Sequence, residues 1–438
     1  MIHRILAALT LLTLALGAPV RAGGECEWAP ITPGAPSAAS GFGFAYDASS
    51  ERIVMVAGRN LSGPLVQETW LYDGDWTLQA VSNPPALDSP ALVYDSAREE
   101  CVLFGGFGPV VGFSDQTWIW DGVAWSERVT PGPPGRSSFG MAFDAARAEV
   151  VIFGGAGGGM DLNDTWVWNG ATWTIRNPPI RPSSRGSLAM AYHAGIEQVV
   201  LFGGFASPVP DDTVGDTWLW NGTSWTELAI PGPPPRSNHQ MTYDPDRDVI
   251  LLWGGYNSTF QSLSDTWQFD GVQWTELSVP GSAPYTANYG LAYDHSRRRF
   301  VLRGSEGNTA IRMYELGQDE INITSSPLDM VRPAGQAATL TIGVENPAAF
   351  SFQWYRNNMP LADGAGLSGA QTPSLTIQSA APNDTGWYRV VVIGSCGAVT
   401  RSAVLAVLCP GDADGDGSVN FADLNLTISN FNTACPTP

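Results

Sequence analysis

Short apolar runs that end in glycine recur along the first three quarters of the chain at a nearly constant interval. The clearest are Val102 to Gly106, Val151 to Gly155, Val200 to Gly204 and Leu251 to Gly255. With two weaker copies, the last glycines fall at residues 58, 106, 155, 204, 255 and 304, which are 48, 49, 49, 51 and 49 residues apart. Apolar runs of this length, closed by glycine, are typical of buried strands. The pattern therefore predicts six copies of one small β unit.

Each of the first five copies also contains a Thr-Trp pair and, six or seven residues later, a second Trp. The Thr-Trp pairs begin at Thr69, Thr117, Thr165, Thr217 and Thr266. An Asp-Gly or Asn-Gly dipeptide lies between the two Trp residues, as at Asp121-Gly122, and such dipeptides close tight hairpins. A further apolar segment before each glycine run, such as Phe139 to Phe143, ends in a turn residue. These signals predict four short strands in each unit.

The double glycine, the paired Trp and the regular period together resemble the kelch repeat over residues 25–316. The resemblance implies an all-β fold with a six-bladed kelch-type β-propeller at residues 23–318. The sixth copy lacks its second Trp. Trp28 lies 19 residues before Asp47, the same spacing as from Trp125 to Asp144. We therefore expect the N-terminal strand to complete the last blade.

A second all-β domain is expected at residues 319–408. Phe352 to Tyr355 contains a Trp suited to a buried central strand, and Asp384 to Tyr388 matches the tyrosine-corner motif. This part of the chain resembles an immunoglobulin-like β-sandwich and implies a spacer or adhesive module. Ile342 and Val390 occupy the places of the two cysteines of that fold, so apolar packing is expected to replace the disulfide.

Composition and charge narrow the partners. The chain has 438 residues with 22 basic and 42 acidic side chains, a net charge of −20 and a pI of about 4.4. This charge argues against nucleic acid as a partner, because phosphate binding needs clustered Lys and Arg. Residues 1–22 read as a signal peptide, with Arg4, an apolar run and a cleavage site at Ala22. We expect a secreted or cell-surface product without a membrane span.

Five cysteines fit an oxidising compartment. Cys101 lies within an apolar run and is expected to be a buried free thiol. Cys409 and Cys435 bracket the C-terminal segment and form the favoured disulfide. Cys26 and Cys396 are left unassigned.

The C-terminal segment, residues 409–438, contains a 12-residue loop with oxygen ligands at the spacing of a calcium loop. Gly417 stands at the sharp turn, and the ligands are Asp412, Asp414, Asp416, Ser418 (through its carbonyl), Asn420 and Asp423. The loop resembles a dockerin half-repeat of the EF-hand type, which implies Ca²⁺ and docking to a cohesin-like partner or a cell surface. Dockerins carry two such half-repeats, whereas one is present here. A helix opening at Asp423 is expected to present Phe421, Leu424, Ile428 and Phe431 on one apolar face.

The loops before the innermost strands are the candidate ligand site. By resemblance to kelch propellers, they lie near the mouth of the central channel. The predicted ligand-binding residues are Arg136, Arg185, Arg236, Asn238, Tyr285 and Asn288. The alternative is that these arginines pair with carboxylates between blades and have a structural role only.

Two enzyme families were compared with this repeat. Copper oxidases of the galactose oxidase type need a convergent pair of histidines, which His193, His239 and His295 do not provide. Sialidases use three arginines, but their Asp-box motif is absent. We therefore expect no catalysis, and a modular protein that binds an extracellular protein or glycan. The alternatives are an exported glycosidase-like enzyme, which would need a carboxylate pair at the channel mouth, and an inert envelope spacer.

Overall fold

The computed structural model describes residues 28–31, 36–60, 62–206, 213–277, 286–306, 310–316, 321–357, 359–364, 366–394 and 397–408. Strands dominate these residues, and three single-turn 3₁₀ helices interrupt them: η1 (Ala194–Ile196), η2 (Pro347–Ala349) and η3 (Pro382–Asp384). No helix in this part of the chain is long and apolar enough to cross a membrane.

Six antiparallel sheets form the larger part of the molecule, and five of them are consecutive in sequence. The first contains β3 (Gly43–Asp47), β4 (Arg52–Val56), β6 (Thr69–Tyr72) and β7 (Trp76–Leu78), and the second β8 (Ala91–Asp95), β9 (Glu100–Phe104), β12 (Thr117–Trp120) and β13 (Trp125–Arg128). The third contains β14 (Gly140–Asp144), β15 (Glu149–Phe153), β18 (Thr165–Trp168) and β19 (Trp173–Arg176). The fourth contains β20 (Arg185–Gly186), β21 (Ala189–His193), β22 (Gln198–Ala206), β23 (Thr213–Trp220) and β24 (Trp225–Leu228). The fifth contains β25 (Gln240–Asp244), β26 (Val249–Trp253), β27 (Thr266–Phe269) and β28 (Trp274–Leu277).

The sixth sheet combines the two ends of this region. It contains β29 (Thr286–Asp294), β30 (Arg299–Glu306) and β31 (Ala310–Leu316), and its outer strand is β1 (Trp28–Ile31). Trp28 lies opposite Leu316, and Ile31 opposite Met313. The chain thus closes a ring by pairing its first described strand with the last strand of the repeat region, which removes an open edge.

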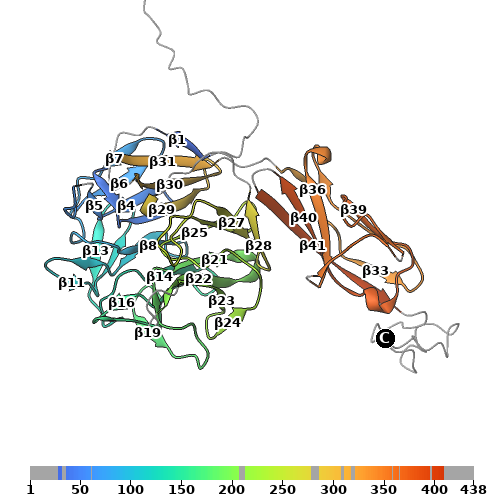
Figure 1. The fold of residues 1–438 in the computed structure, drawn as a ribbon, viewed down its shortest axis with the longest axis horizontal. Coiled ribbons are helices and arrows are strands. Elements are labelled where there is room, and N and C mark those ends of the chain that lie inside the picture. Colours follow the sequence, from blue (N-terminus) through green and yellow to red (C-terminus); the bar gives the residue numbers. More distant parts are fainter. Residues whose placement is uncertain are drawn as a thin grey trace, which may run out of the picture.

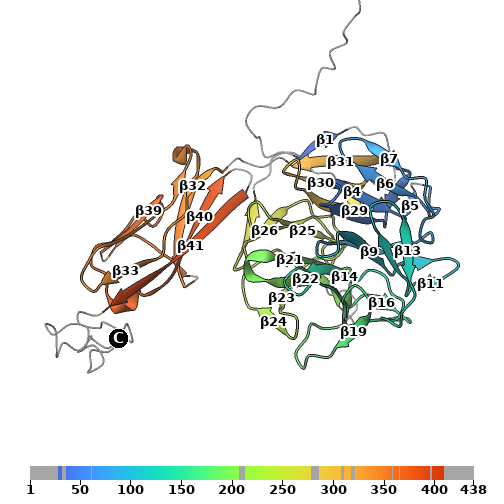
Figure 2. The same cartoon turned by 180° about the vertical axis from the view of Figure 1, so that it is seen from behind.

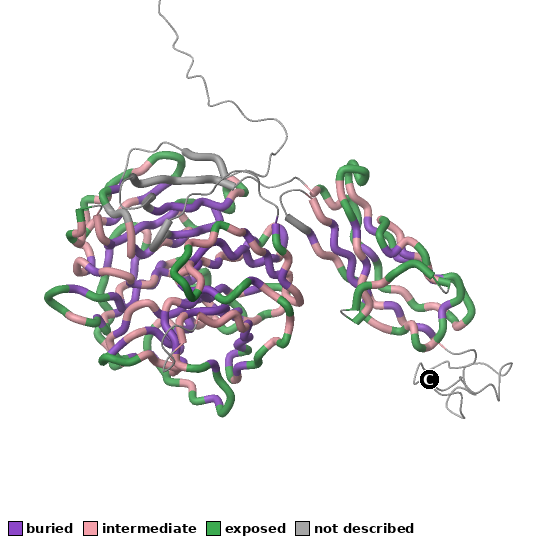
Figure 3. Tube along the Cα trace, in the orientation of Figure 1, coloured by how far each residue is buried: buried purple, intermediate pink, exposed green. Residues whose placement is uncertain are grey.

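The inner strands of the six sheets contact one another in a closed cycle. β3 contacts β8, and the contacts continue through β14, β21, β25 and β29 back to β3. The sheets radiate from this ring as the blades of a six-bladed propeller (Figures 1 and 2). The second strand of each blade is the most deeply buried, as in Val150, Val151, Ile152 and Phe153, because each apolar run is covered by a neighbouring blade on both sides (Figure 3).

The tryptophan repeat fastens adjacent blades. The outer-strand indole N–H donates to the Thr Oγ1 of the preceding blade, from Trp125 to Thr69 (2.8 Å) and from Trp173 to Thr117 (2.9 Å). Trp225 and Trp274 make the same bond to Thr165 (2.9 Å) and Thr217 (3.0 Å). A buried indole N–H needs such a partner, so Thr and Trp recur together.

The immunoglobulin-like domain consists of two main sheets. One orders β33 (Met330–Pro333), β41 (Gly397–Leu408), β40 (Gly386–Gly394), β36 (Ser351–Arg356) and β37 (Met359–Pro360), with β33 parallel to β41. The other contains β34 (Ala338–Thr341), β39 (Ser374–Ile377) and β38 (Leu367–Ser368), and β32 (Ile323–Ser325) pairs with β35 (Gly343–Val344).

In this domain apolar packing occupies the place that a disulfide has in many immunoglobulin folds, as the sequence predicts. Ile342 and Val390 are buried in one cluster with Trp354. The hydroxyl of Tyr388 donates to the backbone carbonyl of Asp384 at 2.8 Å, which is the tyrosine corner.

Two small hairpins and one further pair of strands complete the described part of the propeller. They pair β10 (Phe107–Gly108) with β11 (Gly112–Phe113), β16 (Ala156–Gly157) with β17 (Met160–Asp161), and β2 (Ala38–Ser40) with β5 (Arg59–Asn60). Cys101 is buried and free, and burial raises the pKa of its thiol well above the ordinary value.

The two domains meet at the turn between β27 and β28. The guanidinium of Arg389 on β40 forms an ion pair with Asp270 and stacks on the ring of Tyr355, whose centroid lies 4.4 Å away. The amide of Gln273 donates to the hydroxyl of Tyr355 at 3.2 Å. The ion-paired side chains are 10% and 5% exposed, so this contact is shielded from water.

Replacing Thr117 with Val should destabilise the propeller by about 1 to 3 kcal/mol, because the buried indole N–H of Trp173 loses its acceptor while the side-chain volume is kept. The matched control is Thr266→Val at the same repeat position. Among the described residues the Thr266 hydroxyl has no hydrogen-bond partner, so its removal should be neutral or stabilising. Calorimetric melting of both variants measures the difference, and equal losses would show that the blade-to-blade bond contributes nothing.

Candidate functional site

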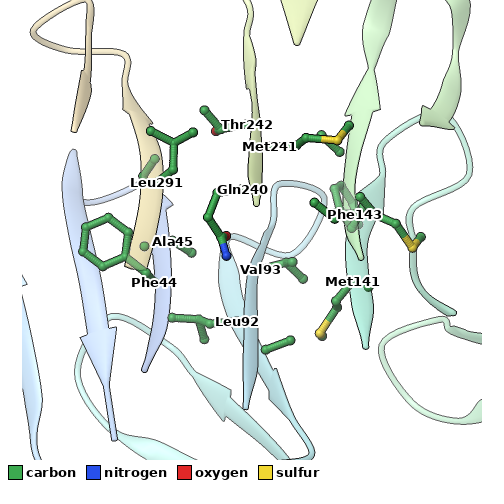
Figure 4. Close-up of a pocket in the computed structure, with 18 of the residues that line it drawn as sticks. Phe44, Ala45, Leu92, Val93, Met141, Phe143, Gln240, Met241, Thr242 and Leu291 are labelled. Carbon is green, nitrogen blue, oxygen red and sulfur yellow. The ribbon is translucent and has the colours of Figure 1, made fainter. Parts of the chain in front are cut away.

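A cavity of about 650 Å³ lies on the propeller axis, and we call it the axial cavity. The six inner strands supply its wall. Figure 4 shows side chains from several of these strands around the space, with Gln240 and Thr242 as its polar members. The apolar members include Phe44, Leu92, Val93, Met141, Phe143, Met241 and Leu291. The lining combines these apolar side chains with serine, tyrosine, Asn, Gln and Thr side chains. A cavity of this size and composition suits a small ligand or a single large side chain.

One end of the axial cavity is surrounded by small residues in the left-handed backbone region. This mouth ring consists of Gly41, Ser89, Ser138, Ser187 and Asn238, with φ between 54° and 60°. Its backbone links neighbouring blades: Ser89 N–H donates to the Gly41 carbonyl (2.8 Å), Ser187 to Ser138 (2.6 Å) and Asn238 to Ser187 (2.8 Å). The backbone is therefore fixed, and three hydroxyls and one amide lie at the opening.

The opposite end is formed by aromatic residues that precede the turns of the inner strands. They are Tyr46, Tyr94, Phe143, Tyr192, Tyr243 and Tyr293. Tyr243 donates to the carboxylate of Asp248 at 2.7 Å, and Tyr293 to Asp246 at 2.5 Å. Burial and these carboxylates raise the pKa of both tyrosines, so they stay protonated. The hydroxyls of Tyr243 and Tyr293 are thus engaged by carboxylates of the turns. We therefore take the mouth ring as the end of the cavity whose polar groups suit a ligand.

No carboxylate, lysine or arginine lines the axial cavity among the described residues. His239 sits in its wall, and burial, aided by the charge of Arg236, lowers its pKa to about 3. His295 also belongs to the lining, at the end formed by the turns, where it lies beside Asp246. The described lining thus contains no Asp, Glu, Lys or Arg side chain. An unpaired charge would be costly to bury in the cavity, so an uncharged group is the ligand that fits. The described lining also offers no carboxylate pair for glycoside hydrolysis.

The three predicted arginines are buried and do not reach the cavity. Arg185 engages all five of its N–H donors: on the carboxylate of Asp216, the carbonyls of Gly203 and Ser183, and the Ser183 hydroxyl. Arg136 pairs in the same bidentate way with Asp164, and Arg236 with Asp265. Each pair lies within one blade, which corrects the expected pairing between blades. In these positions the arginines fix the loop that carries the mouth ring.

The electrostatics of these pairs are the same in all three blades. Burial alone would raise the pKa of Asp164, Asp216 and Asp265, but the bonds from the arginines and from a nearby indole lower it below the ordinary value. The indole belongs to the Trp two residues later, as in Trp218 to Asp216 at 2.7 Å. Arg, Asp and Trp thus form one buried unit in each of these blades.

The remaining predicted residues are distributed as follows. Asn238 lies in the mouth ring. Tyr285 and the side chain of Asn288 lie outside the described residues, as do residues 1–22, Cys26 and Cys396. The whole calcium loop, Asp412, Asp414, Asp416, Ser418, Asn420 and Asp423, and the Cys409 and Cys435 pair also lie outside them. Within the described part of the chain, no three His, Cys, Asp or Glu side chains come together as a metal site.

Sequence reasoning missed the serines of the mouth ring and the apolar wall. Ser138 and Ser187 each follow a predicted arginine by two residues, as Asn238 does. This fixed offset was a usable signal, because it marks the same loop position in three blades.

Exposed apolar side chains project beside the mouth ring, and we call this side of the propeller the mouth face. The β10–β11 hairpin exposes Phe107, Val110, Val111 and Phe113, with Val110 94% exposed. A bridge between Asp88 and Phe107 ties this hairpin to the loop carrying Ser89. Met160 and Phe260 are exposed on the corresponding hairpins of the third and fifth blades. Such residues around a cavity are typical of an interaction surface.

Comparison with known proteins identifies the domain family of one part of the chain. Residues 322–393 match the immunoglobulin domain family, which shows that this part is an immunoglobulin-like domain. No curated protein matches the chain. Among solved structures, it is similar to the "Structure of YjhT" at 11% identity, over 54% of this chain and 83% of that chain, with a TM-score of 0.44. It is also similar to the titin M3 domain at 24% identity, over 20% and 94% of the two chains, with a TM-score of 0.18. The kelch and dockerin resemblances stay predictions.

Asp216→Gln should destabilise the propeller by about 3 kcal/mol, because it leaves the buried Arg185 without its counter-charge. The second blade shows an uncharged version of this pair, because Leu87 and Gln116 occupy the Arg and Asp positions there. The matched control therefore introduces the same two residues into the fourth blade. The double variant Arg185→Leu, Asp216→Gln should recover most of the loss in calorimetric melting. A double variant as unstable as the single one would contradict this account.

His239→Phe should flatten the dependence of stability on pH. The folded pKa of about 3 lies below the unfolded value of about 6.5, so the unfolded state binds the proton first and stability falls as pH falls from about 6.5 towards 3. At pH 5 this costs about 2 kcal/mol in the wild type. Phe42 and Phe139 occupy the same position in other blades, so the substitution fits the site. Urea unfolding at pH 7.5 and 5 measures the change in the free energy of unfolding between the two pH values, with the exposed His295→Asn as the control. If His239→Phe loses as much stability at pH 5 as the wild type does, the lowered pKa of His239 is refuted.

Proposed function

We propose that this chain is an exported modular binding protein whose propeller captures an extracellular protein at its mouth face. The observation that carries the proposal is the axial cavity, whose described lining has no Asp, Glu, Lys or Arg and which opens between exposed apolar hairpins. An apolar side chain of the partner would enter the cavity, and the hydroxyls of Ser89, Ser138 and Ser187 would bind its backbone or polar edge. The hairpin residues Phe107 and Val110 would supply the apolar contact around it.

The exposed hairpin favours a protein partner over a glycan. Phe107, Val110, Val111 and Phe113 offer no polar side chain to the hydroxyls of a sugar, whereas apolar side chains of a protein can pack against them. The glycosidase-like alternative gains no support from the described lining, which contains no acidic side chain.

In this proposal the immunoglobulin-like domain acts as a spacer, and the tail is the docking element. The signal peptide would export the chain to the cell surface or medium. The kelch-type propeller would be carried by a dockerin-like loop that binds Ca²⁺ through Asp412, Asp414, Asp416, Ser418, Asn420 and Asp423. A cohesin-like protein or another surface component would be its docking partner.

Site-specific photo-crosslinking on the full chain tests the proposed face. Benzoylphenylalanine placed at Val110 should yield a covalent adduct with one extracellular protein from the culture fluid of the source organism. The matched control is the same residue at Val123, which is 75% exposed in the turn between β12 and β13 at the opposite end of that blade. Mass spectrometry of the adducts identifies the partner and the crosslinked position.

The outcomes separate the alternatives. An adduct from position 110 that is lost on adding Phe107→Ser supports the proposal. Equal adducts from positions 110 and 123 would indicate unspecific contact and overturn it. Binding to an immobilised glycan panel without any protein adduct would favour the glycan, and no binding of either kind would leave the spacer role.

A further inference from the structure

We propose that the outer face of the five-stranded sheet in the immunoglobulin-like domain holds the chain's own C-terminal segment, residues 409–438, when that segment has bound calcium. This inference rests on the calcium-loop part of the proposed function and adds the surface that the segment contacts once the loop has bound calcium. Two surfaces carry the inference: an uncovered apolar patch on the sheet, and an apolar helix face that the sequence predicts just beyond it.

The patch follows from the strand register. On β40 the residues Tyr388, Val390 and Val392 face the core and are buried, so Trp387 points to the other side. Val404 lies directly opposite Trp387, and Val331 on β33 lies opposite Ala406 of β41. Directly paired residues share a face of the sheet. Trp387, Val404, Ala406 and Val331 therefore form one outer patch.

This patch is exposed in the described part of the molecule. Trp387 is 65% and Val331 56% exposed. The same face two residues further along β40 carries Arg389, which is covered by the propeller turn at Asp270. The propeller contact thus ends where the patch begins. A large Trp surface left in water is unfavourable, and a contiguous apolar patch marks a site of contact.

The position and length of the C-terminal segment match this patch. The segment starts directly after Leu408, which lies four residues past Val404 on the same strand, or about 13 Å. Its thirty residues include the predicted helix from Asp423 to Phe431, whose apolar face needs a partner. A helix of nine residues is about 13 Å long, and the strands β40, β41 and β33 span about 10 Å. A single amphipathic helix of nine residues cannot bury its own apolar face.

Calcium would control the contact through charge. Residues 409–438 contain four aspartates (412, 414, 416 and 423) and no Lys, Arg or His. Without a cation these carboxylates repel one another, and Asp423 is both the last ligand of the loop and the first residue of the helix. Binding of Ca²⁺ would bring them together and form the start of the helix beside the sheet. Because the two events are linked, loss of the patch must weaken calcium binding.

Calorimetric titration of the full chain with CaCl₂ tests this linkage. Trp387→Ser should weaken calcium binding about tenfold, the effect of leaving roughly 60 Å² of apolar surface uncovered. The matched control is Met359→Ser on β37, which removes a side chain that is 70% exposed and lies outside the patch. Met359→Ser should bind calcium as the wild type does.

A crosslink locates the contact directly. Benzoylphenylalanine at position 387 should react with residues 421–431 in CaCl₂ and not in chelator. A mixture of ¹⁴N- and ¹⁵N-labelled chains shows whether the crosslink lies within one chain. The inference would be overturned if the wild type and Trp387→Ser bound calcium with equal affinity and position 387 gave no crosslink to residues 421–431. This result would leave the proposal of the calcium loop itself intact. A crosslink between two chains, or one independent of calcium, would also overturn the inference, and a wild type that does not bind calcium would reject the loop and the inference together.

Discussion

The structure depends on the fact that each propeller blade is apolar on both faces. A strand such as β15 is buried on both sides, so its sheet cannot stand alone and needs a neighbour on each side. Six sheets in a row would leave two uncovered faces, and the closed ring removes them. The pairing of β1 with β31 joins the ends of the region, and the Trp to Thr bonds set the spacing from one blade to the next.

The properties of the axial cavity follow from this ring. Six inner strands around one axis leave a space that their side chains only partly fill. The positive charges nearest to the mouth are used inside the blades, where Arg136, Arg185 and Arg236 hold carboxylates and loop carbonyls. As a result the mouth presents hydroxyls and backbone rather than charge. The same arginines that suggest a binding site in the sequence are the reason that the site is neutral.

Repeat spacing made most of the fold predictable, because a motif that recurs every 49 residues must occupy the same place in every blade. The strand at Trp28 could be assigned to the last blade from its distance to Asp47 alone. Pairing of the arginines with carboxylates was one of two alternatives, but the partners could not be identified, because residues such as Asp216 lie some thirty residues away and no local pattern links the two. The mouth ring was missed because it depends on a left-handed backbone at Ser138 and Ser187, and serine carries no signal of that conformation on its own.

Within the described residues, both domains are held by packing and hydrogen bonds, with Cys101 as the one cysteine among them. Ile342 and Val390 pack against Trp354 where the fold commonly has a disulfide, and Cys101 is a buried thiol with a raised pKa, which makes it unreactive. For the C-terminal segment the sequence predicts another means of stabilisation, because its four aspartates have the spacing of a calcium loop. In the proposed function, a rigid platform with a calcium-dependent tail would keep binding at the mouth face independent of calcium, so that only attachment would respond to it.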